Sequence, residues 1–127
     1  MRLLLDTHTL IWWATDDSAL SGRARDRIAR SEGVLVSAAS AWEMAIKVSL
    51  GRLPSALDLL SDFEESLSSR GFQTLAITAA HGIRAGLLPG PHKDPFDRML
   101  VSQAQAENLA IVSNDVIFDR YGVRRVW

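Results

Sequence analysis

Short apolar runs alternate along this chain with longer segments whose apolar residues have helical spacing. The runs at 3–5, 34–36 and 109–112 contain no alternating polar residues, which is typical of strands buried on both faces. A weaker run lies at 74–77, and the run at 123–127 carries two arginines, as expected of an edge strand. Strands that alternate with helices favour parallel pairing through crossover connections. The sequence therefore predicts an α/β fold with helices on both faces of a parallel sheet.

The clearest predicted helix covers residues 95–107. Asp94 is a suitable N-cap, Pro95 suits the first helical position, and Asp97 is an acid in the first turn. A continuous helix over 56–69 is also predicted, with an apolar face made by Leu57, Leu60, Phe63 and Leu67. Further helical segments are expected at 20–32, 38–50, 78–86 and 115–120. Residues 88–92 (LPGPH) form the clearest predicted loop.

Length and composition limit the classes of protein to which the chain can belong. Its 127 residues are 47% hydrophobic, without repeats or a linker-like segment, so we expect one domain over 1–127. The absence of cysteine excludes disulfides, zinc–cysteine sites and thiol catalysis. A net charge of −1 excludes a polycation that coats nucleic acid. No apolar run reaches the length of a signal-peptide core or a membrane span, so a cytoplasmic location without membrane contact is expected.

Two acids follow apolar runs directly or nearly so. Asp6 ends the first run, and Asp115 lies just past the fourth. Ligands of open parallel sheets bind at the carboxyl ends of strands, where the strand order reverses. A carboxylate beside a core is costly unless it is paired or bound to a metal ion. The alternative is that each acid is only a helix N-cap, because each opens a helical segment.

Glu43 and Asp97 are the other two candidate site acids. Taken alone, Glu43 is better explained as an exposed partner of Lys47 at helical spacing, and Asp97 as an acid that stabilises the first turn of a helix. All four acids nevertheless lie near the starts of helices that follow strands or loops, so they can converge at one end of the sheet. Converging carboxylates need cations, and oxygen ligands select Mg²⁺ or Mn²⁺. Such a site supports phosphoryl transfer.

Four blocks of the chain carry a resemblance to a known family. They are LLLDTHTLIWW at 3–13, SAASAWEMAIKVSLGRL at 37–53, HKDPFDRMLVSQA at 92–104 and IVSNDVIFDRYGVRRVW at 111–127. In this order they resemble the PIN-domain ribonucleases, and among them the VapC-type toxins of toxin–antitoxin pairs. The resemblance implies a three-layer α/β/α fold with about five parallel strands, the first of them central. It also implies an endonuclease that cleaves RNA with one or two Mg²⁺ or Mn²⁺ ions.

The same resemblance assigns roles to individual residues. It places Asp6 and Asp97 as core metal ligands, while Glu43 and Asp115 bind the metal directly or through water. Asp94 is expected mainly as a cap, and Thr7 and Ser113 as supporting residues, with the Ser113 hydroxyl orienting a ligand or water. The resemblance further implies a protein antitoxin as partner and a homodimer.

Residues flanking the acids have weaker assignments. Arg98 and Lys93 are candidates for contact with RNA phosphates, and His8 is a candidate for contact with substrate. His81 and His92 have no acidic or histidine partner at metal-ligand spacing, so a structural role is predicted for both. The tryptophans at 12, 13, 42 and 127 are expected in the core or an interface.

Competing functions belong to different classes. A phosphatase with Asp6 as nucleophile usually needs a second acid two residues later, where this chain has His8. A mononucleotide-binding protein fits poorly, because no glycine-rich loop follows the first strand. A catalytically inactive module that binds RNA or protein would account for the tryptophans but leaves the four acids unexplained. The leading hypothesis is therefore RNA hydrolysis by a metal-activated water.

Overall fold

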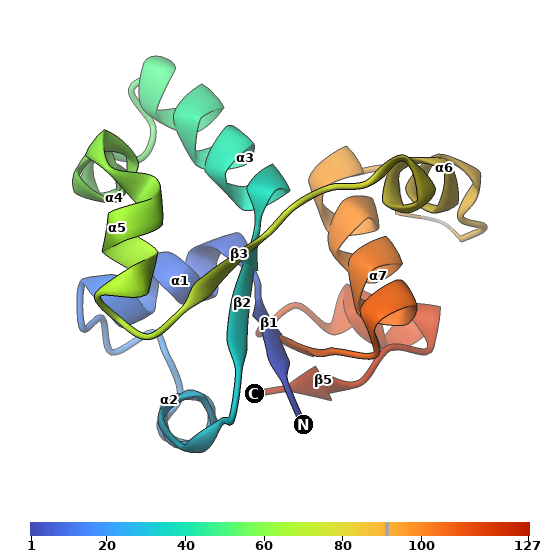
Figure 1. Cartoon of the computed structure of the whole chain (residues 1–127), viewed down its shortest axis with the longest axis horizontal. Coiled ribbons are helices and arrows are strands. Elements are labelled where there is room, and N and C mark those ends of the chain that lie inside the picture. Colours follow the sequence, from blue (N-terminus) through green and yellow to red (C-terminus); the bar gives the residue numbers. More distant parts are fainter. Residues whose placement is uncertain (91) are drawn as a thin grey trace.

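The computed structural model describes residues 1–90 and 92–127, so Pro91 of the predicted loop lies outside the described residues. Helices and strands alternate through most of the chain (Figure 1). The elements are β1 (Leu3–Leu5), α1 (Thr7–Ala14), α2 (Gly22–Arg30), β2 (Val34–Ser37), α3 (Ala38–Ser49), η1 (Pro54–Ala56), α4 (Leu57–Ser61), α5 (Phe63–Ser68), β3 (Gln73–Leu75), α6 (Ala79–Leu87), α7 (Pro95–Glu107), β4 (Ala110–Val112), η2 (Val116–Tyr121) and β5 (Arg125–Val126).

The five strands form one parallel sheet in the order β3-β2-β1-β4-β5. The predicted α/β fold with a central first strand and an edge strand at the C-terminal end is confirmed. The chain adds β2 and β3 on one side of β1 and then returns to add β4 and β5 on the other. The order of strands therefore reverses between β1 and β4, which is where ligands bind in sheets of this kind.

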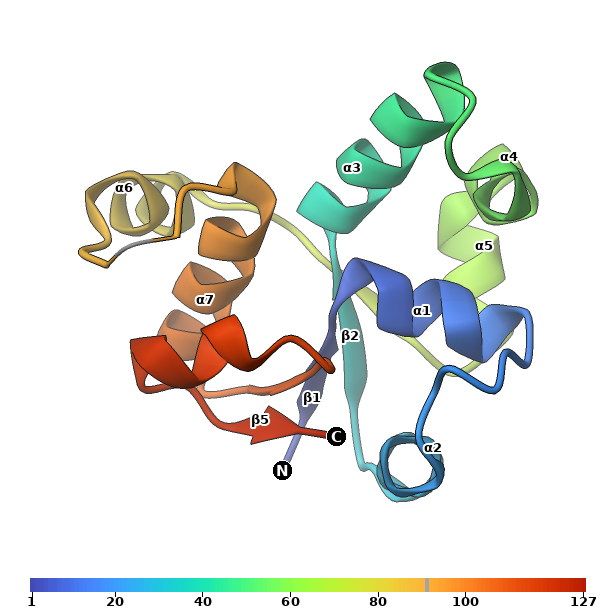
Figure 2. The ribbon, with the colours of Figure 1, turned by 180° about the vertical axis from the view of Figure 1, so that it is seen from behind.

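Alternate residues of the central strands face two separate hydrophobic clusters. Leu3 and Leu5 of β1 belong to the first cluster, together with buried residues of α1, α2, α4 and α5. Leu4 belongs to the second cluster, together with buried residues of α7 and η2. Figures 1 and 2 show these helices on the two sides of the sheet. Because both faces are covered, the central strands carry consecutive apolar residues at 3–5, 34–36 and 110–112, as predicted from their lack of alternation, and β2 ends in the buried Ser37.

The boundaries of α7 agree with the prediction because its start is encoded locally. The Asp94 carboxylate accepts hydrogen bonds from the Phe96 and Asp97 N–H groups, and Pro95 occupies the first helical position. The helix ends at Asn108, whose φ of 54° is left-handed.

The predicted helix over 56–69 is wrong. Asp62 has φ −151° and ψ 79°, which are not helical, and this residue separates α4 from α5. The break changes which residues face the core. Leu57 is exposed instead of buried, whereas Leu59 packs inside the first cluster.

The tryptophans differ in their surroundings. Trp12, Trp13 and Trp127 pack against the first hydrophobic cluster, and Trp12 meets Trp127 edge to face at 5.9 Å between ring centroids. Trp42 is 62% exposed and contacts Phe96 of α7 in the same geometry. Among the described residues, the structure has no helix that combines the length and the hydropathy needed to cross a bilayer.

Candidate metal centre

Asp6 lies at the carboxyl end of β1, at the point where the strand order reverses. Asp6 is 9% exposed, and its Oδ1 accepts a 2.7 Å hydrogen bond from the Thr7 N–H group. Its Oδ2 accepts a 2.7 Å hydrogen bond from the hydroxyl of Ser113, which follows β4. Burial raises the pKa of the Asp6 carboxyl, and these two donors oppose the rise without cancelling it. Asp6 is thus an N-cap, but one held inside the protein with a carboxylate that lacks a cationic hydrogen-bond partner among the described residues.

Glu43 reaches the same end of the sheet from α3, which begins directly after β2. Its Oε1 lies 2.7 Å from Oγ1 of Thr7, and its Oε2 lies 2.7 Å from Nζ of Lys47. The negative charge of Glu43 contributes to the raised pKa of Asp6. The expected pairing with Lys47 is confirmed, but the expected exposure is wrong because Glu43 is only 7% exposed. Thr7, Glu43 and Lys47 therefore form a chain of polar contacts beside Asp6.

Asp97 reaches the site from the first turn of α7. Burial raises its pKa to about 6, and the negative charge of Asp6 adds to this rise. Its Oδ2 lies 2.7 Å from Nε2 of His92, which opposes the rise. His92 was predicted to be structural, and the structure instead places it against a candidate ligand. His92 lies two residues before the N-cap Asp94, in the loop that leads into α7. This loop turns back over the first turn of α7, which brings His92 into contact with Asp97.

Asp94 and Asp115 both act as helix caps. The Asp115 carboxylate accepts a 3.0 Å hydrogen bond from the Ile117 N–H group at the start of η2, and Asp115 is exposed. Its own N–H group donates to the Ser113 hydroxyl, which ties it indirectly to Asp6. The cap prediction is confirmed for both acids. A role of Asp115 in metal binding stays a prediction.

The donor set fits a hard divalent cation. Asp6, Glu43 and Asp97 come from three parts of the chain. The charge of Glu43 helps to raise the pKa of Asp6, and the charge of Asp6 helps to raise the pKa of Asp97. Charged carboxylates are therefore unfavourable at this place unless a cation is present. Ligand atoms of His92, Asp94 and Asp97 also lie within 4.8 Å of one another. Carboxylate oxygens in such an arrangement suit Mg²⁺ or Mn²⁺.

Arg98 makes its hydrogen bonds with main-chain carbonyls, and its expected contact with RNA phosphates stays a prediction. Its Nε donates to the Ala85 carbonyl at 3.2 Å, its Nη1 to the His92 carbonyl at 3.0 Å, and its Nη2 to the Leu88 carbonyl. The guanidinium is thus engaged with the loop between α6 and α7. Lys93 is exposed, and its proposed contact with RNA stays a prediction. His8 lies near enough to lower the pKa of Asp6, and its contact with substrate also stays a prediction.

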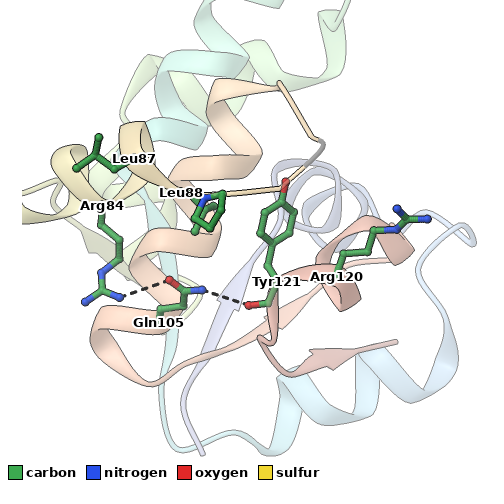
Figure 3. A pocket seen from close by; sticks show the side chains of 7 residues that line it. Arg84, Leu87, Leu88, Gln105, Arg120 and Tyr121 are labelled. Carbon is green, nitrogen blue, oxygen red and sulfur yellow. Dashed lines mark hydrogen bonds between the residues drawn. The ribbon is translucent and has the colours of Figure 1, made fainter.

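A cavity of about 440 Å³ lies on the outer side of the same loop. Figure 3 shows Gln105 of α7 between Arg84 and Tyr121, with hydrogen bonds to the Arg84 guanidinium and the Tyr121 carbonyl. The remaining lining residues are Leu87, Leu88, Pro89 and Arg120. None of the candidate ligands lines this cavity, so it is separate from the acidic cluster.

Three comparisons place these features among known proteins. Ribonuclease VapC22 of Mycobacterium tuberculosis is 28% identical over 114 residues, which cover 89% of this chain and 86% of the relative. The structure of FitAcB from Neisseria gonorrhoeae is 17% identical in sequence and has a TM-score of 0.70. The match covers 97% of this chain and 95% of the matched FitAcB chain. The structure of the sarcin-ricin loop cleaving toxin VapC20 of M. tuberculosis is 13% identical, with 95% of each chain matched and a TM-score of 0.67.

The match to a family model agrees with the topology and with the position of the acids. The model of the PIN domain matches residues 3–124, which include β1 to β4 and all four candidate acids but end just before β5. Asp6, Glu43 and Asp97 lie at the carboxyl edge of the sheet within that match. The chain belongs to the PIN-domain family.

Proposed function

We propose that this chain is a metal-dependent endoribonuclease, the toxin of a VapC-type toxin–antitoxin pair. The observation that carries the proposal is the cluster of Asp6, Glu43 and Asp97 at the point where the strand order of a PIN-domain sheet reverses. The resemblance to ribonuclease VapC22 supports RNA as the substrate. We further propose that the protein acts in the cytoplasm with a protein antitoxin as its partner, and as a homodimer.

The residues of the cluster have separate proposed roles in metal binding and in the positioning of the metal ligands. Asp6 and Asp97 would hold one or two Mg²⁺ or Mn²⁺ ions, with Glu43 and Asp115 as further ligands, direct or through water. When bound, the cation supplies activation of a water molecule for attack on phosphorus and offsets the charge of the phosphate. Ser113 and Thr7 orient Asp6 and Glu43 through the hydrogen bonds they make. Lys47 partly neutralises Glu43, and the first turns of α1 and α7 fix the ligands on rigid backbone.

The proposal is tested by incubating the purified chain with RNA in Mn²⁺, in Mg²⁺ and in excess EDTA. We expect cleavage with either ion, loss of cleavage in EDTA, and its return when Mn²⁺ is added back. Cleavage that persists in EDTA would rule out the metal-dependent mechanism. Tight RNA binding without cleavage under all three conditions would instead favour an inactive binding module.

The partner is tested by expressing the chain together with the small protein encoded beside its gene. An antitoxin is expected to copurify with the chain and to suppress RNA cleavage. Cleavage that is unaffected by the neighbouring protein would contradict the toxin–antitoxin assignment while leaving the nuclease activity intact.

A further inference from the structure

The contact between His92 and Asp97 is short and partly enclosed. The side chains are 27% and 17% exposed, and Nε2 of His92 lies 2.7 Å from Oδ2 of Asp97. An ionised carboxylate oxygen can only accept a hydrogen bond, so Nε2 of His92 is the donor when Asp97 is charged, as it is when it binds a metal ion. The bond restricts rotation of the Asp97 carboxyl group and leaves its other oxygen for a further partner.

Arg98 holds the main chain that carries His92. Its guanidinium donates to three carbonyl groups, one at the end of α6 and two in the following loop, the second being that of His92 itself. A planar guanidinium with donors in fixed directions suits this task, whereas an ammonium group cannot reach three carbonyls in the same way. Arg98 follows Asp97 directly, so one turn of α7 supplies both the candidate ligand and the residue that fixes the loop over it.

Tyr121 holds the same loop from the other side. Its hydroxyl accepts a 3.0 Å hydrogen bond from the His92 N–H group. Figure 3 shows its side chain extending from η2 toward the loop. A Cβ built on Gly90 would lie 2.6 Å from Cε1 of Tyr121, and the φ of Gly90 is +130°, so the ring packs against backbone that requires glycine. Both the N–H and the C=O group of His92 are therefore bound by side chains from elements outside the loop.

We infer that His92 is a positioning residue that orients the Asp97 carboxylate for metal binding, and that Arg98 and Tyr121 hold His92 in place for this purpose. The inference rests on the proposed metal centre. It assigns Arg98 to the architecture of the site rather than to contact with RNA phosphate. Outer partners that orient metal ligands typically change metal affinity by about 10- to 100-fold when they are removed.

The test compares Mn²⁺ binding by the full chain without RNA, followed by calorimetry or by the electron paramagnetic resonance signal of free Mn²⁺. We expect His92→Ala to weaken Mn²⁺ binding by about tenfold or more. His92→Gln can place an amide donor near the position of Nε2, and we expect it to bind Mn²⁺ within about threefold of the wild type. Thermal melting of each variant without metal verifies that it is folded.

Cleavage kinetics supply the second readout. For His92→Ala we expect the Mn²⁺ concentration at half-maximal rate to rise by about the same factor as the dissociation constant, with the KM for RNA unchanged. Unchanged Mn²⁺ binding in His92→Ala would overturn the inference. Equal loss in His92→Ala and His92→Gln would also overturn it, because the imidazole would then be acting as a ligand.

Arg98→Lys separates the two roles of Arg98, because it keeps the charge but loses the three-carbonyl geometry. We expect Arg98→Lys to weaken Mn²⁺ binding as much as Arg98→Met does. The control is Arg84 on the neighbouring α6, whose guanidinium makes one long hydrogen bond to Gln105. We expect Arg84→Lys to leave Mn²⁺ binding unchanged. Wild-type behaviour of Arg98→Lys would overturn the holding role. If the wild-type chain bound no Mn²⁺, both the metal centre and the inference would be overturned. If Mn²⁺ binding depended on His92 but the chain did not cleave RNA, only the proposed nuclease activity would be contradicted.

Discussion

The Ser113 hydroxyl donates a 2.7 Å hydrogen bond to Oδ2 of Asp6 although the two residues are 107 positions apart in the sequence. Ser113 follows β4 and Asp6 follows β1, the two strands between which the strand order reverses. Both residues are buried. The bond therefore joins the two halves of the sheet at the place where the fold offers a ligand site, and it holds a carboxylate whose pKa is raised by burial.

We predict that Ser113→Ala lowers the free energy of unfolding by about 1–3 kcal/mol at pH 7.5, because a buried carboxylate oxygen loses a donor. The pKa of Asp6 is expected to rise further in this variant, since the hydrogen bond that stabilises the charged form is gone. Urea unfolding without divalent cations measures the change.

Ser102→Ala is the matched control for that variant. Ser102 is equally buried, and its hydroxyl donates a 2.7 Å hydrogen bond to a neutral acceptor, the His81 carbonyl. A smaller and pH-independent loss of about 0.5–1.5 kcal/mol is expected. If Ser113→Ala lowered the free energy of unfolding no more than Ser102→Ala at any pH, the hydrogen bond to Asp6 would contribute no more to stability than a bond to a neutral acceptor.

Lys47→Met is predicted to have opposite effects on the metal-free and the metal-bound protein. Without metal, Glu43 loses its cationic partner, and unfolding should become easier by about 1–3 kcal/mol, between the values for exposed and buried ion pairs. With Mn²⁺ present, removal of a competing positive charge should tighten metal binding by roughly threefold or more. Thermal melting across a Mn²⁺ titration reports both effects.

Arg30→Met provides the corresponding control at the surface. Arg30 pairs with Asp26 at the same spacing along α2, but both side chains are more than half exposed. Its loss should change stability by less than about 1 kcal/mol and leave Mn²⁺ binding unchanged. Weaker Mn²⁺ binding in Lys47→Met would contradict the placement of Glu43 beside the metal.

Asp97→Asn is predicted to stabilise the metal-free protein above about pH 6. The pKa of Asp97 is about 6 in the folded protein and 3.8 in the reference state, so the folded chain retains a proton that the unfolded chain has lost between these values. Asp97 therefore lowers the free energy of unfolding progressively as the pH rises from about 4 to about 6. Above pH 6 the carboxylate is charged in both states, and the destabilisation by the buried charge stays at its full value. Melting temperatures in EDTA at pH 4 and pH 7.5 should show the variant's advantage at pH 7.5 only.

Asp119→Asn should show the opposite pH dependence. The Arg125 guanidinium holds the pKa of Asp119 below its usual value, so this carboxyl contributes stability at neutral pH that is lost as pH falls through its folded pKa. We expect the variant to melt below the wild type at pH 7.5, with the difference shrinking in acid. The same pH dependence for both variants would contradict the buried environment assigned to Asp97.

Features encoded by neighbouring residues could be predicted from the sequence. The bounds of α7 follow from Asp94 and Pro95, which act on the adjacent backbone. The central strands follow from apolar runs without alternation, since both faces of the sheet are covered. The break at Asp62 could not be predicted in this way, because the apolar spacing continues through it and the core selects Leu59 instead of Leu57.

Within the site, the acids could be predicted but their surroundings could not. The spacing of Glu43 and Lys47 predicts an ion pair, whereas the burial of Glu43 depends on Thr7 packed against it from another element. His92 precedes the N-cap by two residues and meets the third residue of the helix, a contact that ordinary helical spacing does not include. An N-cap signal preceded by a histidine and followed by an acid is the local pattern that could have indicated this pair.

The most direct test of the proposed activity compares RNA cleavage by the wild type with that by Asp6→Asn in the presence of Mn²⁺, with cleavage sites mapped on total RNA. Asp26→Asn, which removes an exposed acid on α2, is the control for loss of one negative charge. We predict defined cleavage sites for the wild type and Asp26→Asn, and a loss of at least about 100-fold in rate for Asp6→Asn, as expected when a ligand essential to metal-assisted hydrolysis is removed. Cleavage by Asp6→Asn at the same sites and at the wild-type rate would contradict the assignment of this carboxylate cluster as the active site.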